Sequence, residues 1–180
     1  YCTICITCLY TSQCNELVES TDFCNLLIRT ISLTSSYQKK EGITMNIAII
    51  FAGGTGQRMS SSGIPKQFLL VNQKPIIVHT LEHFQNSPNI DKIIVVSLES
   101  GIPQVKSLIV KFGLTKVVSI IAGGKTGQES IFHGLEECRR LCDDDTIVLL
   151  HDGVRPIINE NMIEDCISCV LHHGNAITVA

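Results

Sequence analysis

Residues 45–59, which read Met-Asn-Ile-Ala-Ile-Ile-Phe-Ala-Gly-Gly-Thr-Gly-Gln-Arg-Met, join an apolar run to a glycine-rich turn. The run Asn46–Phe51 has the length and apolar character of a buried strand. The glycines after it lack a Cβ atom, so backbone N–H groups there can approach an anion closely. Arg58 adds a planar set of donors suited to phosphate oxygens, and Lys66 adds a compact cation. This stretch predicts a cradle for nucleotide phosphates; the alternative is a plain strand–helix turn.

Beyond this stretch, short β-branched runs alternate with segments of helical periodicity. We expect further strands at 92–98, 116–121, 146–150 and 176–180, and helices at 75–84, 102–112 and 131–142, with a last helix marked by apolar positions from 163 to 170. Gly113 should close the second of these helices, and the last should stop near Gly174. Strands that alternate with helices indicate a mainly parallel sheet with right-handed crossovers. Ligands of such sheets bind beyond the carboxyl ends of the strands, so the loops that follow the strands are the candidate site. The chain stops inside the last expected strand, and we therefore expect a sheet that is incomplete at its C-terminal end.

The segment His151-Asp-Gly-Val-Arg-Pro156 follows one of these strands. The Asp152 carboxylate can hold a divalent cation on a nucleotide, because Mg²⁺ prefers carboxylate and phosphate oxygens. Arg155 can bind a second, smaller phosphate. A capping Asp beside a surface Arg is the simpler alternative, and we interpret His151 as a structural histidine.

A second glycine-containing turn, Gly123-Gly124, follows the strand expected at 116–121 and precedes a helix that Ser130 opens. The helix N-terminus offers donors to an anion or to the edge of a base, although a simple connection would use the same residues. Gly124-Lys125-Thr126 supplies the end of a P-loop, but Ser119 stands where its first glycine belongs. A dinucleotide fingerprint fails as well, because Met59 replaces its third glycine. A P-loop-like nucleotide hydrolase and a non-catalytic nucleotide-binding module remain as alternative functions.

The charge and the cysteines exclude other classes. The net charge of -3 and the pI of about 6.1 provide no basic field for nucleic acid. No apolar run approaches the roughly 20 residues that cross a bilayer, and no secretory signal is evident, so we expect a cytoplasmic protein without membrane contact. We interpret the nine cysteines as structural or incidental, because Cys2, Cys5 and Cys8 lack the second ligand pair of a zinc site.

Residues 1–44 differ in character from the rest of the chain. They begin at Tyr1, are rich in Cys, Ser and Thr, and have no sustained periodicity. We predict that they form an irregular leader outside the fold, with Met45 as the natural start. Residues 45–180 are then the N-terminal portion of one enzyme domain.

The motifs, in their order, resemble those of one family. Ala52-Gly-Gly-Thr-Gly-Gln-Arg-Met59, Pro65-Lys-Gln-Phe68, the run 74–84, Gly123-Gly-Lys-Thr-Gly-Gln-Glu-Ser130 and His151–Pro156 are similar to the cytidylyltransferases that act on 2-C-methyl-D-erythritol 4-phosphate or ribitol 5-phosphate. The similarity runs from about Met45 to Ala180. Other nucleotidyltransferases share the first motif, but the combination is far more specific.

The resemblance implies a Rossmann-like, three-layer nucleotidyltransferase fold of the glycosyltransferase-A-like kind. It also implies CTP as co-substrate, a Mg²⁺ ion, a homodimer, and a reaction that gives a CDP-alditol and pyrophosphate. Arg58 and Lys66 match catalytic cations, Asp152 matches the metal ligand, and Asp152 and Arg155 match contacts to the alditol phosphate. The nucleotide-binding positions that it implies are Ala52, Gly53, Gly54, Thr55, Gly56, Gly124, Ser130 and Asp152.

This chain departs from the family pattern in two places. Gly127 stands where the family commonly has an arginine, which affects one nucleotide contact. The C-terminal portion that carries the family's dimer arm is not in this sequence. The glycine loop and Val154 lean slightly towards the ribitol branch, while Gly153 occurs on the methylerythritol side, so both substrates stay open.

Overall fold

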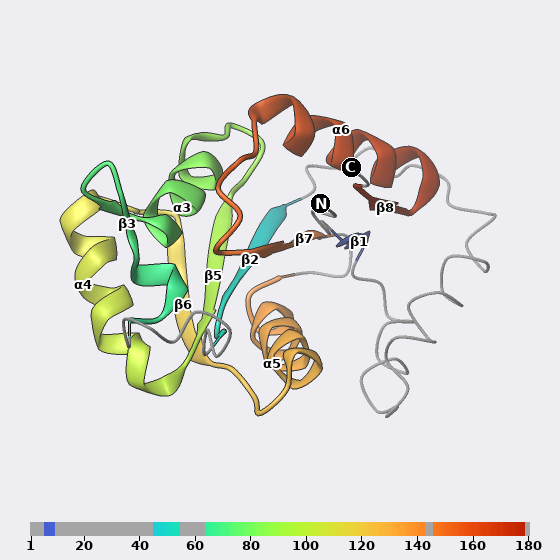
Figure 1. Cartoon of the computed structure of the whole chain (residues 1–180). Coiled ribbons are helices and arrows are strands. Elements are labelled where there is room, and N and C mark those ends of the chain that lie inside the picture. The colour runs from blue at the N-terminus through green and yellow to red at the C-terminus, as the bar shows by residue number, and fades with distance from the viewer. Residues whose placement is uncertain (1–5, 10–44, 55–63, 143–145, 179–180) are drawn as a thin grey trace.

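The computed structural model describes residues 6–9, 45–54, 64–142 and 146–178. A six-stranded sheet runs through its centre in the order β6-β5-β2-β7-β1-β8 (Figure 1). Parallel pairing joins β6 to β5, β5 to β2, and β2 to β7. These four strands are β2 (Asn46–Ala52), β5 (Lys92–Ser97), β6 (Val117–Ala122) and β7 (Ile147–Asp152). The expected mainly parallel α/β architecture is therefore confirmed, and each of these strands lies within two residues of its predicted bounds.

Within the described residues, four helices connect the strands. They are α3 (Ile76–Asn86), α4 (Ile102–Phe112), α5 (Gly127–Arg139) and α6 (Glu160–His173). Gly113 ends α4 and Gly174 ends α6, with φ of 64° and 84°, left-handed values that glycine adopts without steric cost. The Asn159 side chain caps α6 by accepting a hydrogen bond from the Met162 N–H at 2.9 Å. The ends predicted at Gly113 and near Gly174 are confirmed, whereas α6 begins at Glu160, before the predicted position 163, because Asn159 caps it.

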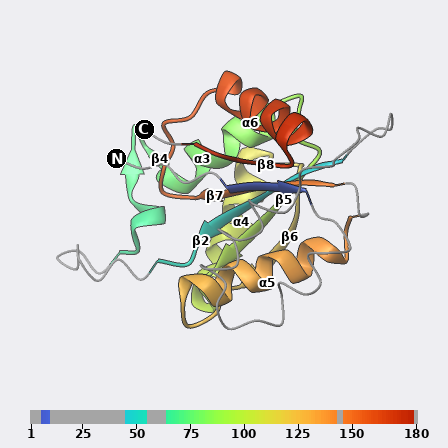
Figure 2. The same cartoon turned by 90° about the vertical axis from the view of Figure 1, so that its right-hand side faces the viewer.

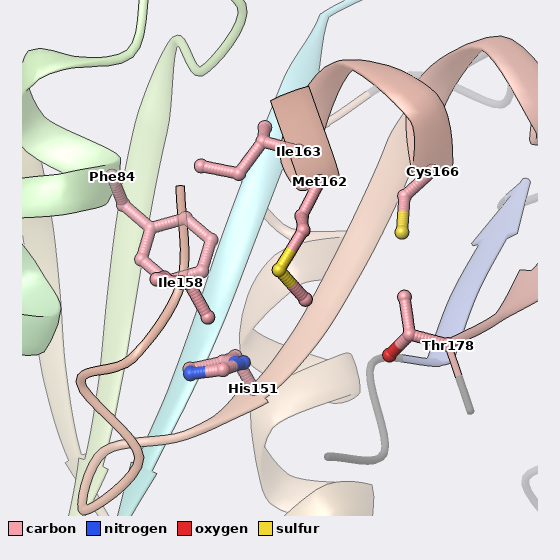
Figure 3. A pocket seen from close by; sticks show the side chains of 7 residues that line it. All are labelled: Phe84, His151, Ile158, Met162, Ile163, Cys166 and Thr178. Carbon is pink, nitrogen blue, oxygen red and sulfur yellow. The ribbon is translucent and has the colours of Figure 1, made fainter. Parts of the chain in front are cut away.

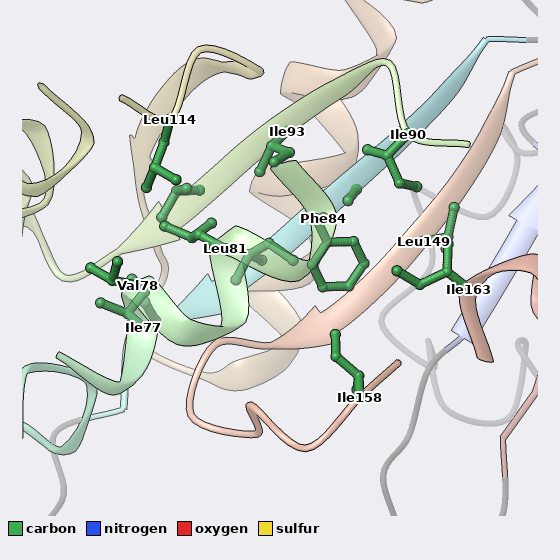
Figure 4. Packing of buried hydrophobic residues seen from close by; sticks show 14 of the residues in the cluster. Ile77, Val78, Leu81, Phe84, Ile90, Ile93, Leu114, Leu149, Ile158 and Ile163 are labelled. Atoms are coloured by element: carbon green, nitrogen blue, oxygen red, sulfur yellow. The ribbon is translucent and has the colours of Figure 1, made fainter. Parts of the chain in front are cut away.

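The sheet separates two apolar layers. Along β2, alternate side chains point to opposite faces: Ala48 and Ile50 join the larger cluster, while Ile47 and Ile49 join the smaller one. Residues of α3, α4 and α6 pack in the larger cluster, and residues of α5 pack in the smaller one (Figure 2). Figure 4 shows Phe84 of α3 in the larger cluster, with Ile163 of α6 nearby. The result is a three-layer arrangement in which the central strands β2, β5 and β7 are buried on both faces.

Short elements lie between β2 and α3. The 3-10 turn η3 (Lys66–Phe68) leads into a two-stranded hairpin of β3 (Leu70–Val71) and β4 (Lys74–Pro75). Asn72 and Gln73 form its turn, with φ of 49° and 63°. Pro75 was expected at the first helical position, but it ends β4 and precedes α3. Another 3-10 turn, η4 (Glu99–Gly101), leads into α4.

The far side of the sheet differs from the prediction. The last strand, β8 (Asn175–Ile177), was expected to extend a mainly parallel sheet, but it pairs antiparallel with β1 (Ile6–Leu9). Strand β1 also pairs antiparallel with β7. Four residues of the segment expected outside the fold thus lie in the sheet. The remainder of residues 1–44 is outside the described residues, so the domain boundary at Met45 stays a prediction.

Neither a membrane span nor a metal cluster is found in the described parts of the chain. No helix there has the length and apolar character to cross a bilayer. No three His, Cys, Asp or Glu side chains there are grouped to hold a metal ion. Among the cysteines whose side chains the structure describes, Cys138 and Cys166 are buried, and Cys142 and Cys169 are half-buried.

Candidate functional site

The predicted motifs meet at one edge of the parallel sheet. Phe51 is paired with Asp152 across β2 and β7, and Ala52 with Ser97 across β2 and β5. The loops after these strands are joined by backbone hydrogen bonds: the Gly153 N–H donates to the Phe51 carbonyl and the Gly123 N–H to the Ser97 carbonyl, both at 2.8 Å. The loops after β2, β6 and β7 therefore open on the same side, as expected for parallel strands.

The glycine loop begins with a buried residue and then opens outwards. Ala52 is buried, Gly53 is half-buried and Gly54 is exposed. A Cβ atom added at either glycine would meet nothing within 4 Å. Packing therefore does not require glycine here, and open space lies beside this backbone. Thr55, Gly56 and Arg58 lie outside the described residues, so their roles stay predictions.

Lys66 opens η3, directly after Pro65. Its side chain is half-buried, whereas Gln67 and Phe68 behind it are buried. The Phe68 ring lies beside Gly101, because a Cβ atom built there would be 3.5 Å from Phe68 Cζ and 3.0 Å from Ser97 Oγ. Ser97 is the last residue of β5. Phe68 thus fixes η3, and with it Lys66, near the carboxyl end of the sheet.

Asp152, the last residue of β7, forms an ion pair with Arg155 in the loop that follows. Arg155 Nε lies 3.2 Å from Asp152 Oδ2, and the two side chains are 44% and 42% exposed. The other carboxylate oxygen, Oδ1, accepts a hydrogen bond from the Val154 N–H at 3.1 Å. Each oxygen of an ionised carboxylate has two lone pairs, so Asp152 can still take an additional ligand. A Mg²⁺ ion held by one carboxylate and by substrate phosphates fits this arrangement, whereas an all-protein cage does not.

His151 directly precedes Asp152 in β7 and is only 2% exposed. Its Nε2 donates to the Arg155 carbonyl at 2.9 Å, since a carbonyl oxygen can only accept. Burial lowers the pKa of His151 below 6.5, although the Arg155 carbonyl and the Asp152 charge act in the opposite direction. The ring is therefore neutral near pH 7 and holds the loop, which agrees with its interpretation as a structural histidine.

The turn at 123–126 differs from the expected anion site. The Gly124 N–H donates to Ser130 Oγ at 3.1 Å, and that hydroxyl donates to the Thr126 carbonyl at 2.9 Å. The N–H groups of Lys125 and Thr126 both donate to Glu129 Oε2, which completes a capping box. Three successive backbone donors are thus engaged within the chain. Gly124 is needed here because an added Cβ atom would collide with the Glu129 side chain. The contacts of Gly124 and Ser130 with a nucleotide stay predictions.

Sequence reasoning missed one residue that contacts this edge. Thr80 of α3 is fully buried, and its hydroxyl donates to the Gly153 carbonyl at 2.9 Å. A signal was present: Thr80 is a polar residue on the apolar stripe formed by Ile77, Leu81 and Phe84. Its partner was not predictable, because Gly153 lies 73 residues further along the chain.

The mainly parallel sheet, its covering helices and the loops at the carboxyl ends of its strands together define an α/β nucleotidyltransferase fold. Residues 46–180 match the family model described as IspD, 2-C-methyl-D-erythritol 4-phosphate cytidylyltransferase, and the chain belongs to this family. The resemblance noted from the motifs is therefore confirmed, and the matched residues agree with the extent expected from about Met45 to Ala180.

Several relatives are similar over the same region. A ribitol-5-phosphate cytidylyltransferase of Streptococcus agalactiae is 52% identical over 134 residues, which are 74% of this chain and 56% of that protein. A 2-C-methyl-D-erythritol 4-phosphate cytidylyltransferase of Clostridium botulinum is 40% identical over 134 residues, which are 74% of this chain and 57% of that protein. The crystal structure of 4-diphosphocytidyl-2C-methyl-D-erythritol synthase from Anaerococcus prevotii superimposes with a TM-score of 0.56 at 27% identity, covering 71% of this chain and 51% of that one. The chain spans about half the length of the curated relatives that it matches.

Proposed function

We propose that the protein containing this chain is a cytidylyltransferase, which joins CTP and an alditol phosphate to give a CDP-alditol and pyrophosphate. The observation that carries the proposal is the juxtaposition of two loops: the hydrogen bond from Gly153 to Phe51 brings the Asp152–Arg155 loop beside the open glycine turn at Gly53. One loop suits a nucleotide, and the other carries a cation for a second phosphate. Membership of the family supports the same assignment.

In this reaction an oxygen of the alditol phosphate attacks the α-phosphorus of CTP in line. A new P–O bond forms there, the bond from the α-phosphorus to the bridging oxygen breaks, and pyrophosphate leaves with that oxygen. The attacking phosphate is already ionised, so the enzyme needs no base to activate it. Positioning and stabilisation of charge then account for catalysis.

The residues of the edge divide between these two tasks. Lys66 and Arg58 stabilise the negative charge on the α-phosphate and on the departing pyrophosphate. Ala52 to Gly56, Gly124 and Ser130 bind the nucleotide, and Arg155 binds the alditol phosphate. Asp152 contacts the ribose region and would hold a Mg²⁺ ion, which would supply positive charge to the phosphates.

Ribitol 5-phosphate is the substrate that we propose first, with 2-C-methyl-D-erythritol 4-phosphate second. The relatives named for ribitol 5-phosphate reach 52% identity, against 40% for relatives named for the methylerythritol compound. The small difference between the two substrates gives a pocket little to discriminate. We also propose that the complete protein is a cytoplasmic homodimer, which size-exclusion chromatography with light scattering tests.

The P-loop-like alternative finds no support at Gly124-Lys125-Thr126. The N–H groups that would hold a phosphate there donate to Ser130 and Glu129 instead. If ATP hydrolysis were found and Lys125→Ala abolished it, that alternative would replace our proposal.

The decisive experiment is pyrophosphate release by the protein expressed from its complete gene. CTP is supplied with ribitol 5-phosphate, with 2-C-methyl-D-erythritol 4-phosphate and with other alditol phosphates, with and without Mg²⁺. We expect release that requires both CTP and one of the first two compounds. CTP binding without any pyrophosphate release would instead indicate a non-catalytic nucleotide-binding module.

A further inference from the structure

Helix α3 is connected to the Asp152–Arg155 loop by the buried hydroxyl group of Thr80. Thr80 is fully buried among apolar residues, where a hydrophobic side chain would satisfy packing alone. Its Oγ1 donates to the Gly153 carbonyl at 2.9 Å, while the carbonyl of its own helix at Ile76 is 3.4 Å away. The shorter hydrogen bond therefore leaves the helix and connects it to the loop.

Gly153 is hydrogen-bonded through both its N–H and its carbonyl. Its N–H donates to the Phe51 carbonyl at 2.8 Å, and its carbonyl accepts from Thr80. An added Cβ atom would lie 2.9 Å from the Phe51 carbonyl oxygen and 3.2 Å from Ile50 Cγ2, so the backbone is pressed against β2. Without the Thr80 hydroxyl, the Gly153 carbonyl would lose its buried partner, which costs free energy and loosens the loop.

A second support lies two residues further on. His151 donates to the Arg155 carbonyl, and its ring packs on Phe84 with 5.3 Å between the ring centroids. Phe84 and Thr80 are one helical turn apart on α3, so one stripe of that helix supports both points of the loop. Figure 3 shows Phe84 and His151 lining a cavity together with Met162. That cavity has a volume of about 20 Å³, enough for about one water molecule.

We propose that Thr80 is a positioning residue, which, together with His151, holds the Asp152–Arg155 loop in place for the alditol phosphate. Thr80 acts through Gly153 and contacts no substrate itself. This inference rests on the proposed function. It separates the two substrates, because the nucleotide loop begins at Ala52 in β2, which the sheet holds on both sides, whereas Arg155 lies beyond the point that Thr80 fixes. Binding of the alditol phosphate should therefore depend on Thr80 more than binding of CTP does.

Two substitutions of Thr80 test this inference in the protein expressed from its complete gene. Thr80→Val keeps the shape and removes the hydroxyl, and Thr80→Ser keeps the hydroxyl and serves as the matched control. We expect Thr80→Val to raise KM for the alditol phosphate about tenfold. KM for CTP should change by less than about twofold, as expected for a site whose hydrogen bonds remain. Thr80→Ser should restore both values. Equal changes for both substrates, or no restoration by Thr80→Ser, would overturn the inference.

Amide hydrogen exchange gives a readout that is independent of activity. In Thr80→Val, the amides of Gly153, Val154 and Arg155 should exchange faster, while those of β5 keep their protection. If exchange in this loop is unchanged, Thr80 does not position it. If the wild-type protein releases no pyrophosphate with any alditol phosphate, the proposed function fails instead. Thr80→Ala is the second variant to use if Thr80→Val does not fold.

Discussion

Lys66 is the predicted catalytic residue whose surroundings the structure describes. Its side chain is half-buried, and Gln67 and Phe68 make the buried contacts of η3. Removing the amine should therefore affect charge stabilisation more than packing. We expect Lys66→Ala to lower kcat by about 10²–10³, the usual loss for one electrostatic contact to a transition state. The free energy of unfolding should change by less than about 0.5 kcal/mol. Pyrophosphate release and urea unfolding measure these two effects.

The control for this substitution is Lys106→Ala, which removes an exposed lysine of α4. It should leave both turnover and stability nearly unchanged. Full turnover in Lys66→Ala would remove Lys66 from the mechanism.

His151 should make the stability of the fold depend on pH. Burial keeps its folded-state pKa below 6.5, while the unfolded chain takes up this proton near the ordinary pKa. Below about pH 6.5 the unfolded state therefore binds more protons, and the free energy of unfolding falls as the pH falls. One such group changes the free energy of unfolding by at most about 1.4 kcal/mol per pH unit. This change stops at pH values below the folded-state pKa of the group. Urea unfolding without divalent metal between pH 8 and pH 5.5 measures this dependence.

Two variants identify the responsible histidine. His151→Gln should flatten the pH dependence, because the buried titrating group is gone. His83→Gln, which changes an exposed histidine of α3, should retain it. If both variants kept the same slope as the wild-type protein, another group would be responsible.

Helix α5 contains two glycines with opposite roles. At Gly134 an added Cβ atom would lie 2.8 Å from Ile49 Cγ2 and 3.1 Å from Val96 Cγ2, so glycine lets the helix approach the sheet closely. We expect Gly134→Ala to lower the free energy of unfolding by about 1–3 kcal/mol, the usual cost of overpacking a core. Urea unfolding measures this change, and the dependence of the free energy of unfolding on urea concentration (the m value) is compared with that of the wild-type protein.

Gly127 provides the matched control in the same helix. It is the first residue of α5 and is exposed, and an added Cβ atom there meets nothing within 4 Å. Gly127→Ala should raise the free energy of unfolding by about 0.5 kcal/mol, because alanine restricts the unfolded chain. Similar effects at the two glycines would contradict the close approach of α5 to the sheet.

At the scale of elements, local chemistry determined what could be predicted from the sequence. The ends of α4 and α6 were predicted because Gly113 and Gly174 mark them, and β2 and β7 because their apolar runs have the length of buried strands. The hairpin of β3 and β4 was missed, since its turn at Asn72-Gln73 lacks the glycine that usually marks such turns. The direction of β8 was missed because it depends on pairing with a strand far away in the sequence.

The site follows the same division between local and distant information. The edge where the motifs meet was predictable, because parallel strands place their carboxyl ends together. The engagement of the turn donors by Ser130 and Glu129 was not anticipated, although Thr126 and Glu129 have the spacing of a capping box. The support from Thr80 to Gly153 needed the packing of α3 against the sheet, which no local pattern contains.

At the scale of the whole molecule, β1 and the domain boundary at Met45 lead to one last test. Strand β8 pairs with β1, which in turn pairs with β7, so removing residues 1–44 deprives β8 of this partner. Among the residues whose burial the structure describes, those of the two apolar clusters lie between Met45 and Ala176, and β2 keeps its parallel pairing with β5 and β7. We therefore expect a chain of residues 45–180 to fold, with faster amide exchange in β7 and β8.

Hydrogen exchange followed by mass spectrometry compares this shortened chain with the chain of residues 1–180. Protection in β2 and β5 should be the same in both, because their partners are unchanged and both strands are buried on both faces. Equal protection of β7 and β8 in both chains would mean that β1 does not stabilise the sheet. That result would support the prediction that residues 1–44 are a leader outside the fold. Loss of protection throughout the shortened chain would mean that the enzyme domain begins before Met45.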